Sequence, residues 1–401
     1  MTQNKCYRRT MIQGGQVTRK SIKEYVEAIK GRYRKGTRDE KGKILDEFSQ
    51  ATGLHRKAAI RSLNRGSPAS RGKRRGRPRQ YGNMVVEALR RVWEESDRLC
   101  SKRLHPFLPE FMGVLRRCGE SNITAEVEGE LCRMSPATID RLLRPWKQKG
   151  GRRSFSTTRP GSLLRSSIPI RTFTDWQENR PGFIEVDLVA HCGESVEGFY
   201  LNTLMAVDVA TGWSEFIGVW GKGQQRVGTG IHHIRERLPF PLLGLDSDNG
   251  SEFINQDLAR WCQRESITFT RSRPYKKNDN CFVEQKNGNI VRRIIGRDRY
   301  SSKQAYETLN RIYYLLRLYV NFFQPAMKLV SKTRHGAKVH RVYDTAQTPY
   351  QRALKSGVMS AANQTQLYST YAHLNPVSLL KQINANVEQL WQLRDRHPDE
   401  K

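Results

Sequence analysis

The sequence has no stretch of apolar residues long enough to cross a membrane, and this lack sets the first limits on its function. A transmembrane helix needs about 20 mostly apolar residues in succession, and no run approaching that length occurs in the 401 residues. The N-terminal stretch MTQNKCYRRTMIQGG also lacks the apolar core of a signal peptide. We therefore expect a protein that stays in the cytoplasm.

Cysteine is scarce and follows no pattern. The seven cysteines are odd in number, widely scattered and without a CxxC pair, which argues against a disulfide framework. The adjacent His232 and His233 have no cysteine nearby at zinc-ligand spacing. These features predict free thiols in a reducing compartment and no zinc-binding module.

Acidic residues are few relative to basic ones. The chain has 39 Asp and Glu against 70 Lys and Arg, a formal net charge of +31. Such an excess favours a polyanionic partner, because each basic residue placed on a phosphate releases a condensed counterion. No basic amphipathic helix with a clean apolar face stands out, so an anionic membrane is the weaker interpretation. The composition therefore indicates a nucleic-acid-binding protein.

Region 1–66 is polar, basic and helical in pattern. An apolar stripe at Ile44, Leu45 and Phe48 is followed by a turn at Gly53 and a second short helical stretch. Two short helices around a glycine turn are typical of a helix-turn-helix DNA-binding domain, and an ordinary helical hairpin is the alternative. The second stretch carries the basic residues that we expect to contact DNA. These are Arg56, Lys57 and Arg61.

Region 67–82 is rich in Gly, Pro, Ser and Arg and is predicted to be a basic linker. Its centre, RGRPR, resembles the AT-hook core, in which an extended Arg-Gly-Arg-Pro lies in a narrow minor groove. That resemblance implies DNA contacts by Arg75, Arg77 and Arg79. A solvated basic tether is the alternative.

Region 83–150 is predicted to be a second helical domain, again with a helix-turn-helix. Ser135 suits a helix N-cap and Pro136 the first helical position. The helix that follows carries Arg141 and Arg144, which we expect to face DNA. A second basic tether is expected over 151–177.

From residue 178 to 325 the pattern changes to alternating and β-branched stretches separated by helical ones, which predicts a central α/β domain with a mixed sheet flanked by helices. A small basic β-rich element is expected over 326–350 and a helical tail over 351–401. The predicted class is thus multidomain, with all-α modules before the α/β domain and a small β-rich and helical region after it.

Three acids lie where this α/β domain would expose them. Asp187 is on the less apolar face of the strand GFIEVDLVA, Asp248 closes the apolar run LLGLDSDNG, and Glu284 begins a later helix. Carboxylates that converge from separate elements suit a hard divalent cation such as Mg²⁺. We predict that these three form a catalytic metal site.

Nearby residues offer alternatives within this site. Asp246 is two residues before Asp248 and shares its face in an extended strand, so it is the second choice. We interpret Asp208 as a turn or structural acid, His191 as a hydrogen-bonded sheet histidine and Glu252 as a solvent-facing residue.

Three motifs carry a family resemblance. EVDLV, DSDNGSEF and NDNCFVEQKNG resemble the catalytic signatures of the DDE transposase and retroviral integrase superfamily, and thirty-five residues separate Asp248 from Glu284, the interval which that family favours. The likeness covers residues 178–297, and the helical modules before it resemble those of bacterial insertion-sequence transposases.

The resemblance implies an RNase H-like core, with Asp187, Asp248 and Glu284 binding Mg²⁺, or Mn²⁺ as a substitute. It implies a bacterial, nucleoid-associated transposase that acts on transposon-end DNA and target DNA as a homo-oligomer. It also implies that Asn287 and Arg292 face DNA, although Gly288 stands where many members carry lysine. The basic loop before Glu284 is expected to clamp phosphate through Arg271, Arg273, Lys276 and Lys277.

Two other functions fit the same features. The chain could be a DNA-binding regulator whose integrase-like core is inactive, or a metal-dependent DNA nuclease of RNase H-like fold. The nuclease would cut DNA without joining it, and it would give two DNA-reading modules less to do.

Overall fold

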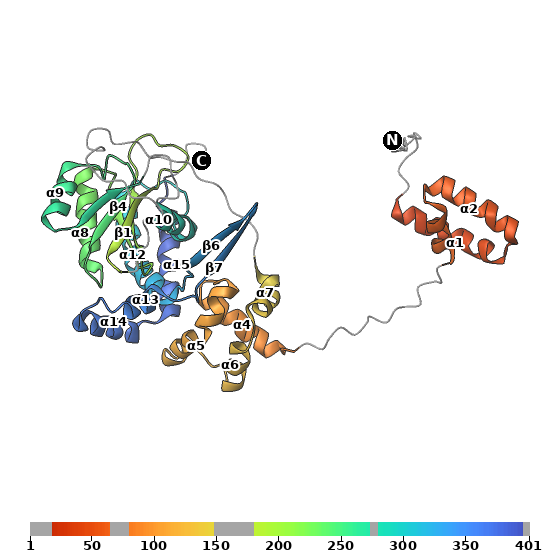
Figure 1. Ribbon diagram of the computed structural model, residues 1–401, viewed down its shortest axis with the longest axis horizontal. Coiled ribbons are helices and arrows are strands. Elements are labelled where there is room, and N and C mark those ends of the chain that lie inside the picture. The colour runs from red at the N-terminus through yellow and green to blue at the C-terminus, as the bar shows by residue number, and fades with distance from the viewer. Residues whose placement is uncertain (1–17, 65–79, 148–179, 273–279, 396–401) are drawn as a thin grey trace. The chain divides into compact units, whose positions relative to one another are not determined.

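A computed structural model gives the structure of residues 18–64, 80–147, 180–272 and 280–395 (Figure 1). The chain divides into two compact units, Met1–Gln80 and Tyr81–Lys401. Each unit is described by itself.

The described part of the first unit folds into three helices: α1 (Arg19–Lys35), α2 (Arg38–Thr52) and α3 (Arg56–Asn64). Thr37 begins α2 with a capping box, in which the Thr37 N–H donates to the Glu40 carboxylate at 2.7 Å. The helix ends at Gly53, whose φ of +68° favours glycine. Phe48 and Leu63 are fully buried between the helices. The two helices around a glycine turn are therefore present, preceded by α1 within the region that the sequence predicted to be helical.

The second unit begins with helices that we predicted to form a separate domain. They are α4 (Asn83–Glu95), α5 (Ser101–Arg117), α6 (Ala125–Cys132) and α7 (Pro136–Leu143), followed by the short 3₁₀ turn η1 (Arg144–Trp146). Their apolar side chains join one core with the later helices. The Tyr319 hydroxyl donates to the Glu95 carbonyl at 3.3 Å, and the Gln324 amide donates to the Ser96 carbonyl at 3.1 Å. The helical block is thus packed into the same compact unit as the sheet.

A five-stranded mixed sheet forms the centre of the second unit. Its strands are β1 (Phe183–Ala190), β2 (Asn202–Asp208), β3 (Ser214–Val219), β4 (Gly244–Ser247) and β5 (Thr268–Arg271), in the order β3-β2-β1-β4-β5. The pairs β1–β2 and β2–β3 are antiparallel, whereas β1–β4 and β4–β5 are parallel. The mixed α/β class predicted for this region is confirmed.

Helices cover both faces of this sheet. Ile184 and Val186 pack with α8 (Gln224–Arg237) and α9 (Gln256–Arg264) in one apolar cluster. Val189 packs on the other face, in the cluster that includes α10 (Cys281–Lys286) and α12 (Lys303–Phe323). Because side chains alternate along a strand, Glu185 and Asp187 share the face of Val189. The acids of β1 therefore point to the side of the sheet on which α10 lies.

The edge strand β3 is closed by side chains of α12. The Asn321 amide donates to the Ser214 carbonyl at 2.8 Å and accepts from the Ser214 N–H at 2.8 Å. The Asn310 amide oxygen accepts from the Gly218 N–H at 2.9 Å. These amides occupy backbone groups that an edge strand would otherwise leave open.

Between those asparagines, Arg317 makes a bidentate ion pair with Glu215 of β3. Nε lies 2.6 Å from Oε2 and Nη2 lies 2.8 Å from Oε1. The Glu215 carboxylate also accepts from the Trp213 indole N–H at 2.8 Å, and the residue is fully buried. This pair ties α12 to the sheet.

The C-terminal part consists of a two-stranded ribbon and three helices. They are β6 (Leu329–His335), β7 (Lys338–Tyr343), α13 (Pro349–Lys355), α14 (Ala361–His373) and α15 (Pro376–Gln392). The helices share the core of the second unit through buried residues such as Tyr350 and Leu390. None of the helices in the described residues combines the length and apolarity of a membrane span.

Candidate active site

The first two acids meet where β1 and β4 run side by side. The parallel register places Val186 beside Ser247, so Asp187 and Asp248 are the next residues along neighbouring strands. Both residues are half-buried. Asp246 lies one step inside the sheet, almost fully buried, and accepts a hydrogen bond from the Thr270 hydroxyl. The carboxyl end of β4 therefore presents Asp248 and holds Asp246 in the interior.

The Asp-Asn-Gly-x-x-Phe motif forms the loop after β4, and its members have separate structural roles. Asp248 Oδ1 accepts from the Gly250 N–H at 2.9 Å. The Asn249 amide donates to the Ser272 carbonyl at 2.8 Å and so fastens the loop to the end of β5. Phe253 is fully buried in the apolar cluster beneath α8 and α9. This loop is thus held at both ends, with Asp248 at its start.

Gly250 lies where two carboxylates converge. A Cβ atom at this position would stand 2.8 Å from Oε1 of Glu252 and 2.9 Å from Oδ1 of Asp248. Such distances are shorter than real Cβ contacts, so any side chain would push these carboxylates apart. The glycine is needed because Asp248 and Glu252 share one small space.

The third acid, Glu284, stands in the first turn of α10, which is held against β1 at two points. The Val283 N–H donates to Glu185 Oε2 at 2.7 Å. The Asn287 amide donates to Asp187 Oδ2 at 2.7 Å. These bonds bracket Glu284 and fix its exposed position beside Asp187.

The helix changes its winding after Glu284. Residues Asn287–Val291 form the π-helical turn η4, and α11 (Arg292–Ile294) follows. Such turns are rare and occur frequently at functional sites. Here Asn287 begins the turn and is buried with its amide on Asp187.

The electrostatics of Asp187 and Asp248 follow from burial and like charge. Burial raises the pKa of Asp187 well above its ordinary value, and the nearby carboxylates of Asp248, Glu284 and Glu252 raise it further. Burial also raises the pKa of Asp248 to about 6, with smaller contributions from Glu252 and Glu284. We call Asp187, Asp248, Glu252 and Glu284 the acidic cluster. Concentrated negative charge of this kind favours a bound cation.

Glu252 is the member that sequence reasoning missed. We interpreted it as a solvent-facing residue, but it is half-buried and influences the pKa of both aspartates. Its position four residues after Asp248 gave no signal, because the loop between them has no regular period. Only the folded loop brings the two carboxylates together.

One further acid and one histidine have the structural roles that we predicted. Asp208 accepts from the backbone N–H groups of Gly182 at 2.8 Å and Thr211 at 2.7 Å, which confirms it as a turn acid. His191 is fully buried with Nε2 2.6 Å from the Thr203 hydroxyl, and burial lowers its pKa to about 3. His191 is therefore a neutral sheet histidine.

The residues predicted to contact DNA from the core lie in different settings. Asn287 is buried with its amide on Asp187 instead of facing outward. Arg292 is half-buried, and desolvation lowers its pKa. Arg271 is buried and donates to the Asn249 amide oxygen at 3.1 Å, so it belongs to the motif loop and not to a phosphate clamp.

The remaining predicted contacts are exposed or lie outside the described residues. Lys57 and Arg61 are exposed on α3, where Arg56 pairs with Asp46. Arg141 and Arg144 are exposed at the end of α7. The residues outside the described ranges are Arg75, Arg77, Arg79, Arg273, Lys276 and Lys277.

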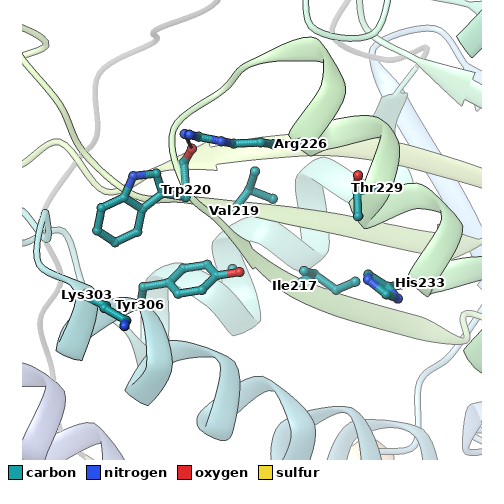
Figure 2. Close-up of a pocket in the computed structure, with 10 residues that line it drawn as sticks. Ile217, Val219, Trp220, Arg226, Thr229, His233, Lys303 and Tyr306 are labelled. Carbon is teal, nitrogen blue, oxygen red and sulfur yellow. Dashed lines mark hydrogen bonds between the residues drawn. The ribbon is translucent and has the colours of Figure 1, made fainter. Parts of the chain in front are cut away.

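A pocket of about 500 Å³ lies away from the acidic cluster, at the β3 edge of the sheet (Figure 2). Residues of β3, α8 and the start of α12 line it, among them Trp220, Arg226 and Tyr306. None of its lining residues is acidic. Its chemistry is thus unrelated to that of the acidic cluster.

The oxygen ligands of the acidic cluster suit a hard cation, although they do not form a closed cage. Across the described residues, no group of three or more His, Cys, Asp or Glu side chains is arranged to hold a metal ion. Mg²⁺ is usually bound by one or two carboxylates together with waters and substrate phosphates. An open set of carboxylates from β1, β4 and α10 therefore fits Mg²⁺ bound jointly with a phosphate-bearing substrate.

Comparisons with known proteins give a close sequence relative and a distant structural one. Over 331 residues the chain is 44% identical to the "Uncharacterized protein y4rM" of Sinorhizobium fredii, a match that covers 82% of this chain and 94% of that protein. The catalytic core domain of BIV integrase matches 44% of this chain and 95% of its own length at 21% identity, with a TM-score of 0.29. No protein-family model matches the chain.

Proposed function

Since the chain belongs to the same family as protein y4rM of Sinorhizobium fredii, a name that specifies no activity, we propose the function from the site: a DNA transposase that cuts transposon ends and joins them to target DNA. In this proposal the mixed sheet is an RNase H-like core, as the sequence motifs imply. The observation that carries the proposal is the convergence of Asp187, Asp248 and Glu284 from three separate elements. These are the acids that stand in the three motifs of the DDE superfamily.

The acidic cluster supports a metal-dependent reaction on phosphodiesters. Asp187, Asp248 and Glu284 would hold Mg²⁺, or Mn²⁺ in its place. When bound there, the metal would polarise the phosphodiester and lower the pKa of the attacking hydroxyl. Glu252 contributes negative charge beside Asp248, and its side chain is the fourth candidate ligand.

The remaining residues of the site orient these acids. Glu185 accepts a hydrogen bond from the Val283 N–H and so fixes the first turn of α10, and the Asn287 amide donates to Asp187. Asn249 holds the loop that carries Asp248. Catalysis of phosphoryl transfer depends mainly on positioning and charge stabilisation, so these contacts support catalysis without touching the reacting atoms. Water attacks first and frees a 3′-hydroxyl, which then attacks the target strand.

DNA recognition is assigned to the helical modules and the basic segments. The exposed residues Lys57 and Arg61 on α3, together with Arg141 in the last turn of α7 and Arg144 directly after it, support binding of the helical modules to the ends of the element. The RGRPR segment and the basic loop before Glu284 complete this assignment. Pairing two ends requires at least two copies of the chain on DNA.

The test of this function is a joining assay with the full chain. Labelled duplex from the ends flanking the gene, supercoiled plasmid and Mg²⁺ are incubated with wild type or with Glu284→Gln. We expect joined products from wild type alone, since Glu284→Gln removes one charged ligand and leaves the bonds of Val283 and Asn287 intact. Cutting without joining would identify a nuclease. Equal, salt-sensitive DNA binding by both proteins without any product would identify a regulator.

Gly250→Ala tests the geometry of the acidic cluster. The added Cβ would displace Asp248 and Glu252, and misplacement of a catalytic group by about 1 Å can cost 10²-fold in rate. We expect activity to fall by about 10²-fold while the unfolding free energy changes by less than about 1 kcal/mol, because the displaced atoms end flexible side chains. The matched control is Gly228→Ala in α8, where a Cβ meets nothing within 4 Å. Unchanged activity in Gly250→Ala would show that the close approach is not required.

A further inference from the structure

The β6–β7 ribbon is a surface without a covering element in the described part of the chain. Every residue of β6 is exposed, as is every residue of β7 apart from the half-buried Val339. Figure 1 shows the ribbon apart from the five-stranded sheet. An isolated two-stranded ribbon is at best marginally stable in water. The side chains of the ribbon therefore do not form a hydrophobic core of their own.

The ribbon is basic. Residues 329–343 contain four Lys or Arg, two His and no Asp or Glu. The register puts Lys332 directly opposite Arg341, so these side chains share a face, together with Arg334 two residues along. Like charges directly opposite each other destabilise a strand pair. No acid in the ribbon offsets this repulsion, so the ribbon loses some stability. A local loss of stability of this kind indicates a functional surface.

The base of the ribbon is fixed to the second unit. Arg352 Nη1 donates to Asp344 Oδ2 at 2.7 Å, and the Lys328 N–H donates to Asp344 Oδ1 at 2.6 Å. The Lys328 ammonium donates to the carbonyls of Val209 and Ala210 at 2.9 and 2.6 Å. The ribbon thus has an anchored base, while its charges further out are exposed.

This anchor lies at the opposite end of the sheet from the acidic cluster. Val209 and Ala210 follow β2 at the end where β1 begins, because Ile184 pairs with Asp208. Asp248 follows the other end, beyond the pair of Val186 and Ser247. A partner held by the ribbon therefore contacts the protein at a separate place from the acids.

We propose that the β6–β7 ribbon is a DNA-binding arm that lies in the major groove of duplex DNA, outside the acidic cluster. The major groove is about 12 Å wide and admits a two-stranded ribbon, whereas the minor groove is about 6 Å wide. The choice of DNA as the polyanion rests on the proposed function. A second copy of the ribbon fits less well, since it would bring equal positive charge against Lys332, Arg334 and Arg341.

The test uses the full-length triple variant Lys332→Ala, Arg334→Ala and Arg341→Ala and a 30-base-pair duplex of random sequence. Binding is measured without divalent metal at several salt concentrations, so that no chemistry occurs. We expect affinity to fall by about tenfold or more, and the slope of log affinity against log salt to become shallower by about 0.9 for each lost phosphate contact. The matched control removes three exposed charges elsewhere in the unit. Its substitutions are Arg311→Ala, Lys355→Ala and Lys381→Ala.

Three results would overturn the proposal. They are an unchanged affinity with an unchanged oligomer, an unchanged affinity with a smaller oligomer, which would assign the ribbon to a second copy, and an equal loss of affinity in the control variant. The duplex-binding measurement and the joining assay together distinguish failure of the proposed arm from failure of the proposed transposase function. A ribbon variant that loses duplex affinity, in a protein that neither cuts nor joins DNA, supports the arm and refutes the transposase.

The groove is tested by duplex methylated at N7 of guanine, which alters only the major groove. Methylation is expected to weaken binding by wild type more than binding by the triple variant, which keeps only the major-groove contacts proposed for the helical modules. A minor-groove ligand that removes the difference between wild type and the triple variant would place the ribbon in the minor groove and overturn the assignment.

Discussion

Asp187→Asn is expected to abolish cutting and joining and, at the same time, to stabilise the metal-free protein at neutral pH. The loss of a charged ligand at the centre of the acidic cluster should lower the rate by about 10²–10³-fold or more, as removal of a single preorganised electrostatic contact does elsewhere. Asp187 accepts hydrogen bonds from the Asn287 amide at 2.7 Å and from the Leu188 N–H at 2.8 Å, and the single amide oxygen of the variant can accept only one of them. The expected activity loss therefore combines the missing charge with one missing hydrogen bond.

The gain in stability follows from the raised pKa of Asp187. A carboxyl whose pKa is higher in the folded state binds its proton more tightly there. Its contribution to stability is complete below the pKa of the unfolded chain, about 3.9, and is lost as the pH rises through the folded pKa. Asp187→Asn removes this loss. Wild type without metal should therefore lose stability on going from pH 4 to pH 8 more steeply than the variant.

Thermal unfolding of the full chain across this pH range, with chelator or with Mg²⁺, checks both effects. Mg²⁺ should raise the unfolding temperature of wild type more than that of Asp187→Asn, because a ligand that binds only the folded state stabilises it. Asp257→Asn is the control, since this residue is exposed on α9. A variant that is equally active, or less stable than wild type at pH 8 without metal, would contradict the role given to Asp187.

Arg317→Leu is expected to produce the largest loss of stability. Glu215 would remain fully buried without its bidentate partner, and breaking a buried ion pair by removing one partner costs about 3–5 kcal/mol. All seven tryptophans lie after residue 80, so tryptophan fluorescence during urea denaturation reports on the second unit alone. The midpoint should move to clearly lower urea.

The double variant Glu215→Met with Arg317→Leu separates charge from packing. Replacing both partners by apolar residues is often neutral or stabilising, so it should recover most of the lost stability. The double variant would fail to recover if the loss came from packing of the Arg317 stem. A single variant as stable as wild type would show that water or another group compensates Glu215.

The positions of Asp187 on β1 and of Asp248 after β4 could be predicted from the sequence because their signals are local. Asp187 alternates within a strand pattern, and Asp248 ends an apolar run, so each is marked by its own neighbours. Glu252 and Asn287 carry no such mark. Their roles depend on an irregular loop and on a π-helical turn, and the sequence pattern of a regular helix or strand does not describe either.

In the fold, too, features with a local sequence signal could be predicted and features that depend on tertiary packing could not. The mixed sheet and the glycine turn after α2 follow from periodicity and turn chemistry, whereas the packing of residues 83–147 into the second unit does not. Amphipathic helices show that an apolar face is buried but not against which element. Side chains such as Tyr319 and Gln324 identify the partner only in the folded chain.

The asparagines of α12 that occupy the backbone of β3 affect how copies of the chain can associate. Pairing of transposon ends would gather copies of the chain at high local concentration. Under that condition an unpaired edge strand can pair with the same strand of another copy and so lead to fibres. Asn310 and Asn321 already bond the backbone groups of Gly218 and Ser214. At these positions β3 offers no template for another strand, so copies gathered on DNA as proposed would contact one another there through side chains.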